Sequence, residues 1–146
     1  MKKQPIYLLL FVFLSFTSSC SNDDDTEPTN ENLKNVTTCE LTIRPDTQVS
    51  ICIDGTDFAS PDEIITFAST FFSKNDIPSN AQFLWNIESG SMEIMNVENT
   101  VDGLIAKSIA TIQFKSDYLG NGVIRVNAEN DTGSGSSVHK IELESN

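Results

Sequence analysis

Basic residues are scarce in this 146-residue chain, in which nine Lys and Arg stand against 21 Asp and Glu. Lys2 and Lys3 precede every acidic residue, so the chain beyond position 19 holds seven basic and 21 acidic residues, a formal charge of −14. Nucleic acid is disfavoured as a partner, because its phosphates require clustered Lys and Arg. Strong negative charge promotes solubility, and it permits cation binding without demonstrating it.

Histidine is also nearly absent, since His139 is the only one. Without a second His, the chain offers neither a His-based zinc site nor a clear nucleophile–His triad. The acidic residues Asp54, Asp57, Asp62 and Glu63 do not have the spacing of an EF-hand, so a solvated loop is a better interpretation than a calcium site. We therefore expect no catalytic residue, no metal and no cofactor, and a function other than catalysis.

Long hydrophobic runs are missing as well. The run from Ile6 to Phe16 is interrupted by Ser15, and it is well short of the roughly 18 apolar residues that a membrane-spanning helix needs. Lys2 and Lys3 stand before it and small residues follow it, which is the pattern of a secretory signal peptide. The sequence therefore predicts that residues 1–19 direct export and are removed.

A cysteine follows these small residues at once. The stretch Thr17-Ser18-Ser19-Cys20 resembles the bacterial lipobox, although Thr17 stands where that motif usually has Leu. The resemblance implies that Cys20 begins the mature protein and carries lipid, and two acyl signals together anchor a protein stably. We therefore expect a membrane partner, reached through the lipid anchor on Cys20.

Ser21, Asn22, Asp23, Asp24 and Asp25 resemble the acidic export signal of surface lipoproteins in one large group of Gram-negative bacteria. The resemblance implies a lipid-anchored protein of the outer membrane that faces the cell exterior. A solvated acidic linker without an address is the alternative. Residues 20–35 are poor in large apolar side chains, so we interpret them as a flexible tether, which would span roughly 20 Å as a coil. Residues 36–146 remain as one domain.

Short segments of alternating apolar and polar residues fill this domain, separated by clusters of Gly, Asn, Asp and Ser. A period of two indicates β-strands, and about seven or eight strands in a domain of this size is the count of an immunoglobulin-like sandwich. A helix is the alternative for residues 60–73, but their Ile, Thr and Phe favour a strand. We therefore expect an all-β fold, an immunoglobulin-like antiparallel β-sandwich.

Five stretches of the domain carry a family resemblance: FLWNI (83–87), SGS (89–91), ATIQF (110–114), GVIRVNAEN (122–130) and GSG (133–135). Together they resemble the PKD-like, immunoglobulin-like domains of bacterial cell-surface proteins, over about half of the domain. Many relatives have a cysteine after the position of Asn130, where this chain has Asp131. The resemblance implies a role in spacing or adhesion.

Six residues on alternating positions form the predicted core: Phe83, Trp85, Ile112, Phe114, Ile124 and Val126. A sugar-stacking platform is the alternative for Trp85, but the parity that it shares with Phe83 and Ile87 favours the core. Tyr118, in the polar loop 116–121, is then the best remaining candidate for an exposed aromatic ring.

Cys39 and Cys52 are the remaining cysteines, and two exported thiols in one small domain tend to pair. A tight turn at Pro45-Asp46 would place them opposite one another on adjacent strands, whereas the hydrophobic pattern of the same strands would place them on opposite faces. Their strands could also belong to different sheets. We expect a disulfide between them.

Two functions fit these observations. The first is a non-catalytic surface lipoprotein that presents one immunoglobulin-like domain for protein or matrix contacts. The second is a glycan-binding accessory lipoprotein of a surface sugar-uptake system. Exposed aromatic rings on one sheet face would favour the second, because sugar sites stack on flat rings.

Overall fold

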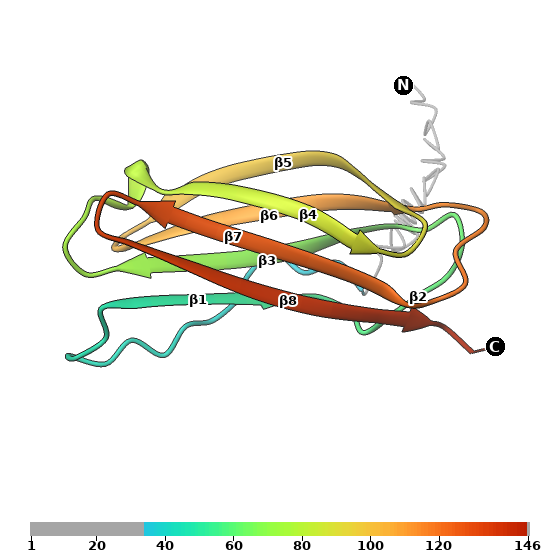
Figure 1. Ribbon diagram of the computed structural model, residues 1–146, viewed down its shortest axis with the longest axis horizontal. Helices are drawn as coiled ribbons and strands as arrows, with labels where there is room; N and C mark the ends of the chain where they lie inside the picture. Colours follow the sequence, from blue (N-terminus) through green and yellow to red (C-terminus); the bar gives the residue numbers. More distant parts are fainter. Residues whose placement is uncertain (1–33, 146) are drawn as a thin grey trace, which may run out of the picture.

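Two four-stranded sheets face one another in the computed structural model, which describes residues 34–145 (Figure 1). The first sheet contains, in spatial order, β1 (Val49–Asp54), β3 (Ile64–Ser73), β6 (Ile105–Phe114) and β5 (Met92–Asp102). The second contains β2 (Phe58–Ala59), β8 (Gly133–Leu143), β7 (Gly122–Asn130) and β4 (Gln82–Ser89). A short 3-10 helix, η1 (Pro78–Asn80), lies between β3 and β4 in the chain.

This strand order is that of an immunoglobulin-like sandwich. In constant-type immunoglobulin domains, strands A, B, E and D form one sheet and strands C, F and G the other. Here β1, β3, β6 and β5 occupy the first set of places, and β4, β7 and β8 the second. The short strand β2 pairs in parallel with β8, where the chain passes from the first sheet to the second. The predicted fold class is therefore confirmed, with eight strands.

The core fills the space between the sheets, into which every second side chain of each strand points. The indole Nε1 of Trp85 donates a hydrogen bond of 2.9 Å to Oγ of Ser108, and both residues are buried. No buried side-chain nitrogen or oxygen of residues 34–145 lacks a partner. The predicted core residues lie in this layer: Trp85, Ile112, Phe114, Ile124 and Val126 are buried, and Phe83 is half-buried against them.

Strand β3 is buried on both of its faces. Phe67 and Phe71 point inward, and Phe71 meets the ring of Phe83 edge to face, with 6.4 Å between the ring centroids. The outward-pointing residues Thr70 and Phe72 are also buried. The reason is that residues 34–43, called the strap below, lie over the outer face of this strand: Val36 donates its backbone N–H to Thr66, and Thr70 Oγ1 donates to the Cys39 carbonyl at 2.6 Å.

The strap corrects the predicted hairpin between the two cysteines. Cys39 lies in a segment without strand structure, so neither predicted register exists. The neighbours of Cys52, Ile51 and Ile53, pack against the inner core, which turns Cys52 outward to meet the strap. The predicted disulfide does form, across a Cα–Cα distance of 6.1 Å. With a sequence separation of 13 residues, it stabilises the fold by about 3 kcal/mol in the loop-entropy account.

Tyr118 is buried, so its prediction as an exposed ring is wrong. It lies between β6 and β7, the region that holds the tyrosine corner of immunoglobulin domains. Its ring meets Phe114 edge to face at 4.8 Å, and its hydroxyl donates to the Ile141 carbonyl at 2.7 Å. Gly122 makes this approach possible, because a Cβ there would stand 2.7 Å from the hydroxyl oxygen. The polar loop thus ties β6 to β8 across the sandwich.

Replacing Tyr118 with Phe should keep the ring contact and remove the hydrogen bond to Ile141. We expect urea denaturation of the full-length chain to show a loss of about 1–2 kcal/mol in the free energy of unfolding near pH 7. Burial raises the pKa of Tyr118. Because the folded-state pKa lies above the unfolded value of about 10, stability should fall in the wild type as the pH rises past that value. A variant with the same alkaline fall as the wild type would contradict this role.

Candidate interaction surface

The N-terminal signals predicted from the sequence lie outside the described residues: the lipidation site Cys20 and the export residues Ser21, Asn22, Asp23, Asp24 and Asp25. The described chain begins at Lys34, whose Nζ lies 2.8 Å from Glu63 and 2.6 Å from Glu144. Partial burial of Lys34 opposes its charge, but the hydrogen bonds that its ammonium donates to Glu144 and Glu63 outweigh this and raise the pKa of Lys34. The strap therefore starts at the end of the sandwich that holds the start of β3 and the end of β8.

The opposite end, on the left of Figure 1, is called the distal end. It contains four connections, namely residues 44–48 before β1, 74–81 between β3 and β4, 103–104 between β5 and β6, and 131–132 between β7 and β8. Immunoglobulin domains group their loops at the two ends of the sandwich, and variable domains bind antigen with loops of one end. The distal end is therefore a candidate surface for recognition.

Asp76 orders two of the turns of the distal end. Its Oδ1 accepts hydrogen bonds from the Ile77 N–H at 2.7 Å and from Asn80 Nδ2 at 2.8 Å. Its Oδ2 accepts the N–H of Asp131 at 3.1 Å, which joins the turn after β3 to the turn after β7. Asn130 Oδ1 accepts the N–H of Gly133 at 3.0 Å and so closes the second turn. Side-chain oxygens that bond nearby backbone groups in this way fix turn conformations.

Apolar side chains are exposed at this ordered end. Ile77 is 65% exposed on the turn that Asp76 orders, and Leu104 is 74% exposed on the two-residue turn between β5 and β6. A groove of about 250 Å³ separates η1 from β5 and is lined by Pro78, Ala81, Phe83, Asn99, Val101 and Ala106. Asp102 follows Val101 on the opposite face of β5, and hydrogen bonding from Lys107 lowers the pKa of Asp102. The distal end thus combines a fixed backbone, an apolar groove and negative charge.

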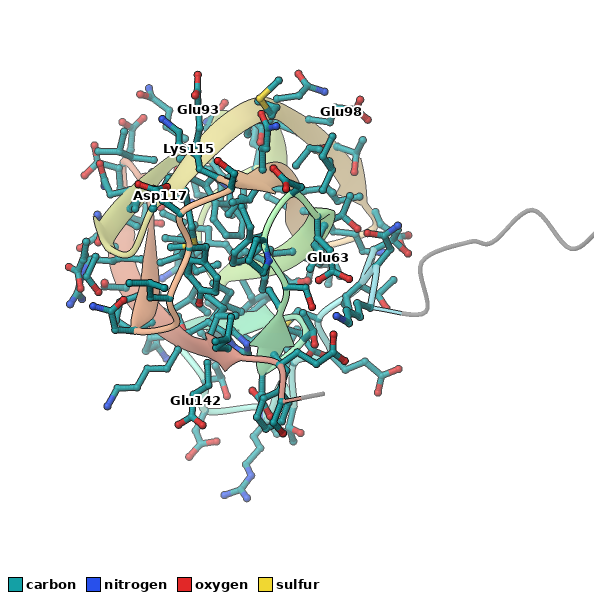
Figure 2. The ribbon with its side chains drawn as sticks, turned by 90° about the vertical axis from the view of Figure 1, so that its right-hand side faces the viewer. Glu63, Glu93, Glu98, Lys115, Asp117 and Glu142 are labelled. Atoms are coloured by element: carbon teal, nitrogen blue, oxygen red, sulfur yellow. A yellow bond between two sulfur atoms is a disulfide. The ribbon has the colours of Figure 1, made fainter. Side chains whose placement is uncertain are left out.

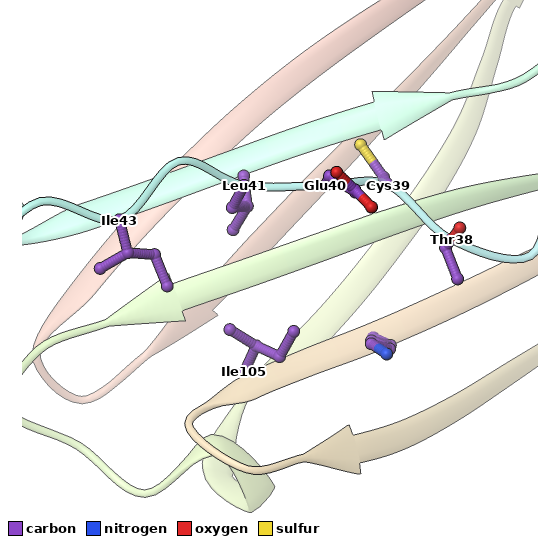
Figure 3. A pocket seen from close by; sticks show the side chains of 7 residues that line it. Thr38, Cys39, Glu40, Leu41, Ile43 and Ile105 are labelled. Atoms are coloured by element: carbon purple, nitrogen blue, oxygen red, sulfur yellow. The ribbon is translucent and has the colours of Figure 1, made fainter.

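A second groove, of about 290 Å³, lies between the strap and β6 (Figure 3). Leu41 and Ile43 of the strap face Ile105 across it. Lys107 is also among the residues that line it. The groove exists because the strap covers β3 and leaves the outer face of β6 partly open. The alternating Leu41 and Ile43, predicted to form a strand, contribute instead to this covering segment.

The acidic residues weighed as a calcium site are dispersed. Asp54 Oδ1 accepts the N–H of Gly55, and Glu63 is engaged by Lys34 and by the Ser60 N–H. Within residues 34–145 no three His, Cys, Asp or Glu side chains come together as metal ligands would.

His139 packs in the core, with its ring centroid 5.6 Å from that of Phe67. Its Nε2 lies 2.9 Å from the Thr56 carbonyl and 3.4 Å from Asp57. These contacts are those of a structural residue that joins β8 to the loop before β2.

The outer face of the second sheet is predominantly polar. A groove of about 470 Å³ there is lined by Gln82, Phe83, Leu84, Asn127 and Glu129. Phe58, at 49%, is the only aromatic side chain that is extensively exposed in the described part of the chain. The described faces therefore offer amide and carboxylate groups to a sugar, but not the stacked aromatic platform that would favour glycan binding.

No helix between residues 34 and 145 is both long enough and apolar enough to cross a bilayer. No protein-family model matches the chain, and no curated protein matches it. Among solved structures, a fragment of the twitchin kinase of C. elegans, described as an autoregulated protein kinase with immunoglobulin domains, is similar with 13% sequence identity and a TM-score of 0.44. The match covers 66% of this chain and about a fifth, 21%, of that one. The assignment of the fold rests on the strand order.

Asp76 was not singled out in the sequence, and its substitution tests the order of the distal end. In Asp76→Ala, the amide protons of Ile77 and Asp131 lose their acceptor, so we expect both to exchange with solvent at least about tenfold faster by NMR. Asp46→Ala is the matched control, because it removes an exposed carboxylate from the same end without touching these amides. Unchanged exchange in Asp76→Ala, or equal effects in both variants, would contradict the ordering role.

Proposed function

We propose that the protein is a non-catalytic surface lipoprotein that presents one immunoglobulin-like domain, with the distal end directed outward for protein or matrix contacts. The observation that carries this proposal is that the two ends of the domain differ. Lys34, the described residue nearest to the predicted anchor at Cys20, is held by Glu63 and Glu144 at one end. The turns with exposed Ile77 and Leu104 lie at the other end.

The predicted anchor and the fold support one another in this proposal. Strands of ten or eleven residues make the sandwich roughly 35 Å long. A domain held by the Lys34 end would therefore carry its distal end well beyond the lipid headgroups. The PKD-like resemblance of residues 81–143 fits the same role in spacing or adhesion.

Glycan binding for a surface sugar-uptake system is the alternative. The polar groove on the second sheet supports it, because Gln82, Asn127 and Glu129 present hydrogen-bonding groups on one surface. The near absence of exposed aromatic rings in the described residues counts against it. Protein or matrix contact is the function that the surface favours.

Protease shaving of intact cells tests the surface location. We expect external protease to remove the domain of the wild-type protein and to spare an Asp23/Asp24/Asp25→Ala variant, because the aspartates are proposed to route the protein to the exterior. Both proteins should be cut after lysis. Cys20→Ala is the control for anchoring and should release the domain from the membrane fraction. Protection of the wild-type domain in intact cells would place it in the periplasm and contradict the proposal.

A further inference from the structure

We propose that the free edge of β5 is a strand-addition site for an extended partner segment in which apolar and basic side chains alternate. The inference deepens the proposed function, because it names the class of partner for a surface next to the distal end. In strand addition, a peptide extends an existing sheet through backbone hydrogen bonds, and pockets select its alternate side chains.

The first argument is the edge itself. β5 is the last strand of the first sheet and runs for 11 residues from Met92 to Asp102. A bulge interrupts its pairing with β6 between Ile94 and Asn96, but the pairing is regular from Asn96 to Asp102. Proteins usually blunt such edges with Pro, charged side chains, bulges or very short strands. This strand has one bulge and three acidic side chains but neither Pro nor Lys, and among the strands of residues 34–145 only β6 pairs with it.

The second argument is an uncovered apolar strip on the inner face of β5. Val97 and Val101 pair with Ala110 and Ala106 of β6, which are 0% and 3% exposed. Val97 is nevertheless 37% exposed and Val101 is 51% exposed, because the second sheet ends at β4. The groove beside η1, with Phe83 in its wall, opens beside Val101. An added strand would place every second side chain beside this strip and would cover part of its exposed apolar surface.

The third argument is charge on the outer face. Glu93, Glu98 and Asp102 belong to β5, which contains no basic residue. Lys115 lies near Glu93 and Lys107 near Asp102, whereas Glu98 bonds only Asn96 among the residues that the structure describes. Opposite charges on neighbouring strands stabilise pairing and like charges oppose it. The outward side chains of the partner should therefore be basic.

The same charges argue against a second copy of this chain as the occupant. Pairing β5 with another β5 would bring two acidic strands together without a basic residue on either one. The formal charge of −14 beyond position 19 adds to the repulsion. A foreign segment with alternating Val-like and Lys-like residues satisfies both faces, which a second copy does not.

The test uses the full-length protein, purified in detergent, and a fluorescent synthetic peptide that alternates Val and Lys. We expect saturable binding by fluorescence anisotropy. Two N-methylated forms of the peptide have the same charge and composition. In each form, methyl groups block the backbone N–H groups that point to one side of the extended peptide, and the two forms block opposite sides. Strand addition predicts that one form binds at least about tenfold more weakly while the other still binds, because only one side pairs with β5.

Matched variants locate the site. Glu98→Lys should weaken binding about fivefold, and Glu142→Lys, which makes the same charge change on the opposite side of the sandwich, should not (Figure 2). Val101→Thr should weaken binding about threefold, whereas Val138→Thr, at a 39% exposed Val on the outer face of the second sheet, should not.

Several results would overturn the inference: equal effects of both N-methylated peptides, equal effects within either pair of variants, no binding of the peptide, or self-association of the protein through β5. These measurements do not depend on where the protein lies in the cell. Protection from protease together with normal peptide binding would refute the surface location alone. Removal of the domain by external protease together with no peptide binding would refute the strand-addition site alone.

Discussion

The central strand β3 must be covered on both faces, and much of the structure follows from that requirement. Phe67 and Phe71 are covered by the second sheet, whereas Thr70 and Phe72 on the opposite face need the strap. The strap is therefore part of the fold, and the disulfide from Cys39 to Cys52 joins it to the neighbouring strand. The strap begins at Lys34, which is held beside Glu63 and Glu144. The position of Lys34 therefore decides which end of the sandwich is nearer to Cys20 along the chain.

A consequence is that the two ends and the two edges of the sandwich are unequal. One end holds the start of the strap and the ion pairs of Lys34, while the distal end carries exposed Leu104 and, on a turn ordered by Asp76, exposed Ile77. On the edges, the first sheet extends past the second and leaves Val97 and Val101 partly uncovered on β5. Binding surfaces on immunoglobulin-like domains are built from such loops and edges, so the asymmetry gives the domain a direction.

The sequence predicted the sandwich because alternation of apolar residues depends only on the local chain, as in Trp85 on β4 and Val126 on β7. The strap was mistaken for a strand because Leu41 and Ile43 alternate although they cover another strand. Tyr118 looks exposed in the sequence because neither of its partners belongs to its polar loop: Phe114 ends β6, and Ile141 lies 23 residues after Tyr118 along the chain. The sequence does not show that β5 lies at an uncovered edge or that Asp76 and Asp131 meet at the distal end. Both features depend on the order of strands in the sheets, which a local pattern of residues does not contain.

The orientation of the domain on a membrane is the central claim, and energy transfer to the membrane surface measures it directly. A donor fluorophore attached at Leu104→Cys or at Ser145→Cys of the lipidated full-length protein, in vesicles whose lipid headgroups carry an acceptor, compares the distal end with the Lys34 end. A separation of roughly 35 Å along the strands predicts efficient energy transfer from position 145 and much weaker transfer from position 104. Equal transfer from both positions would show that the domain lies flat on the bilayer and would contradict an outward-facing distal end.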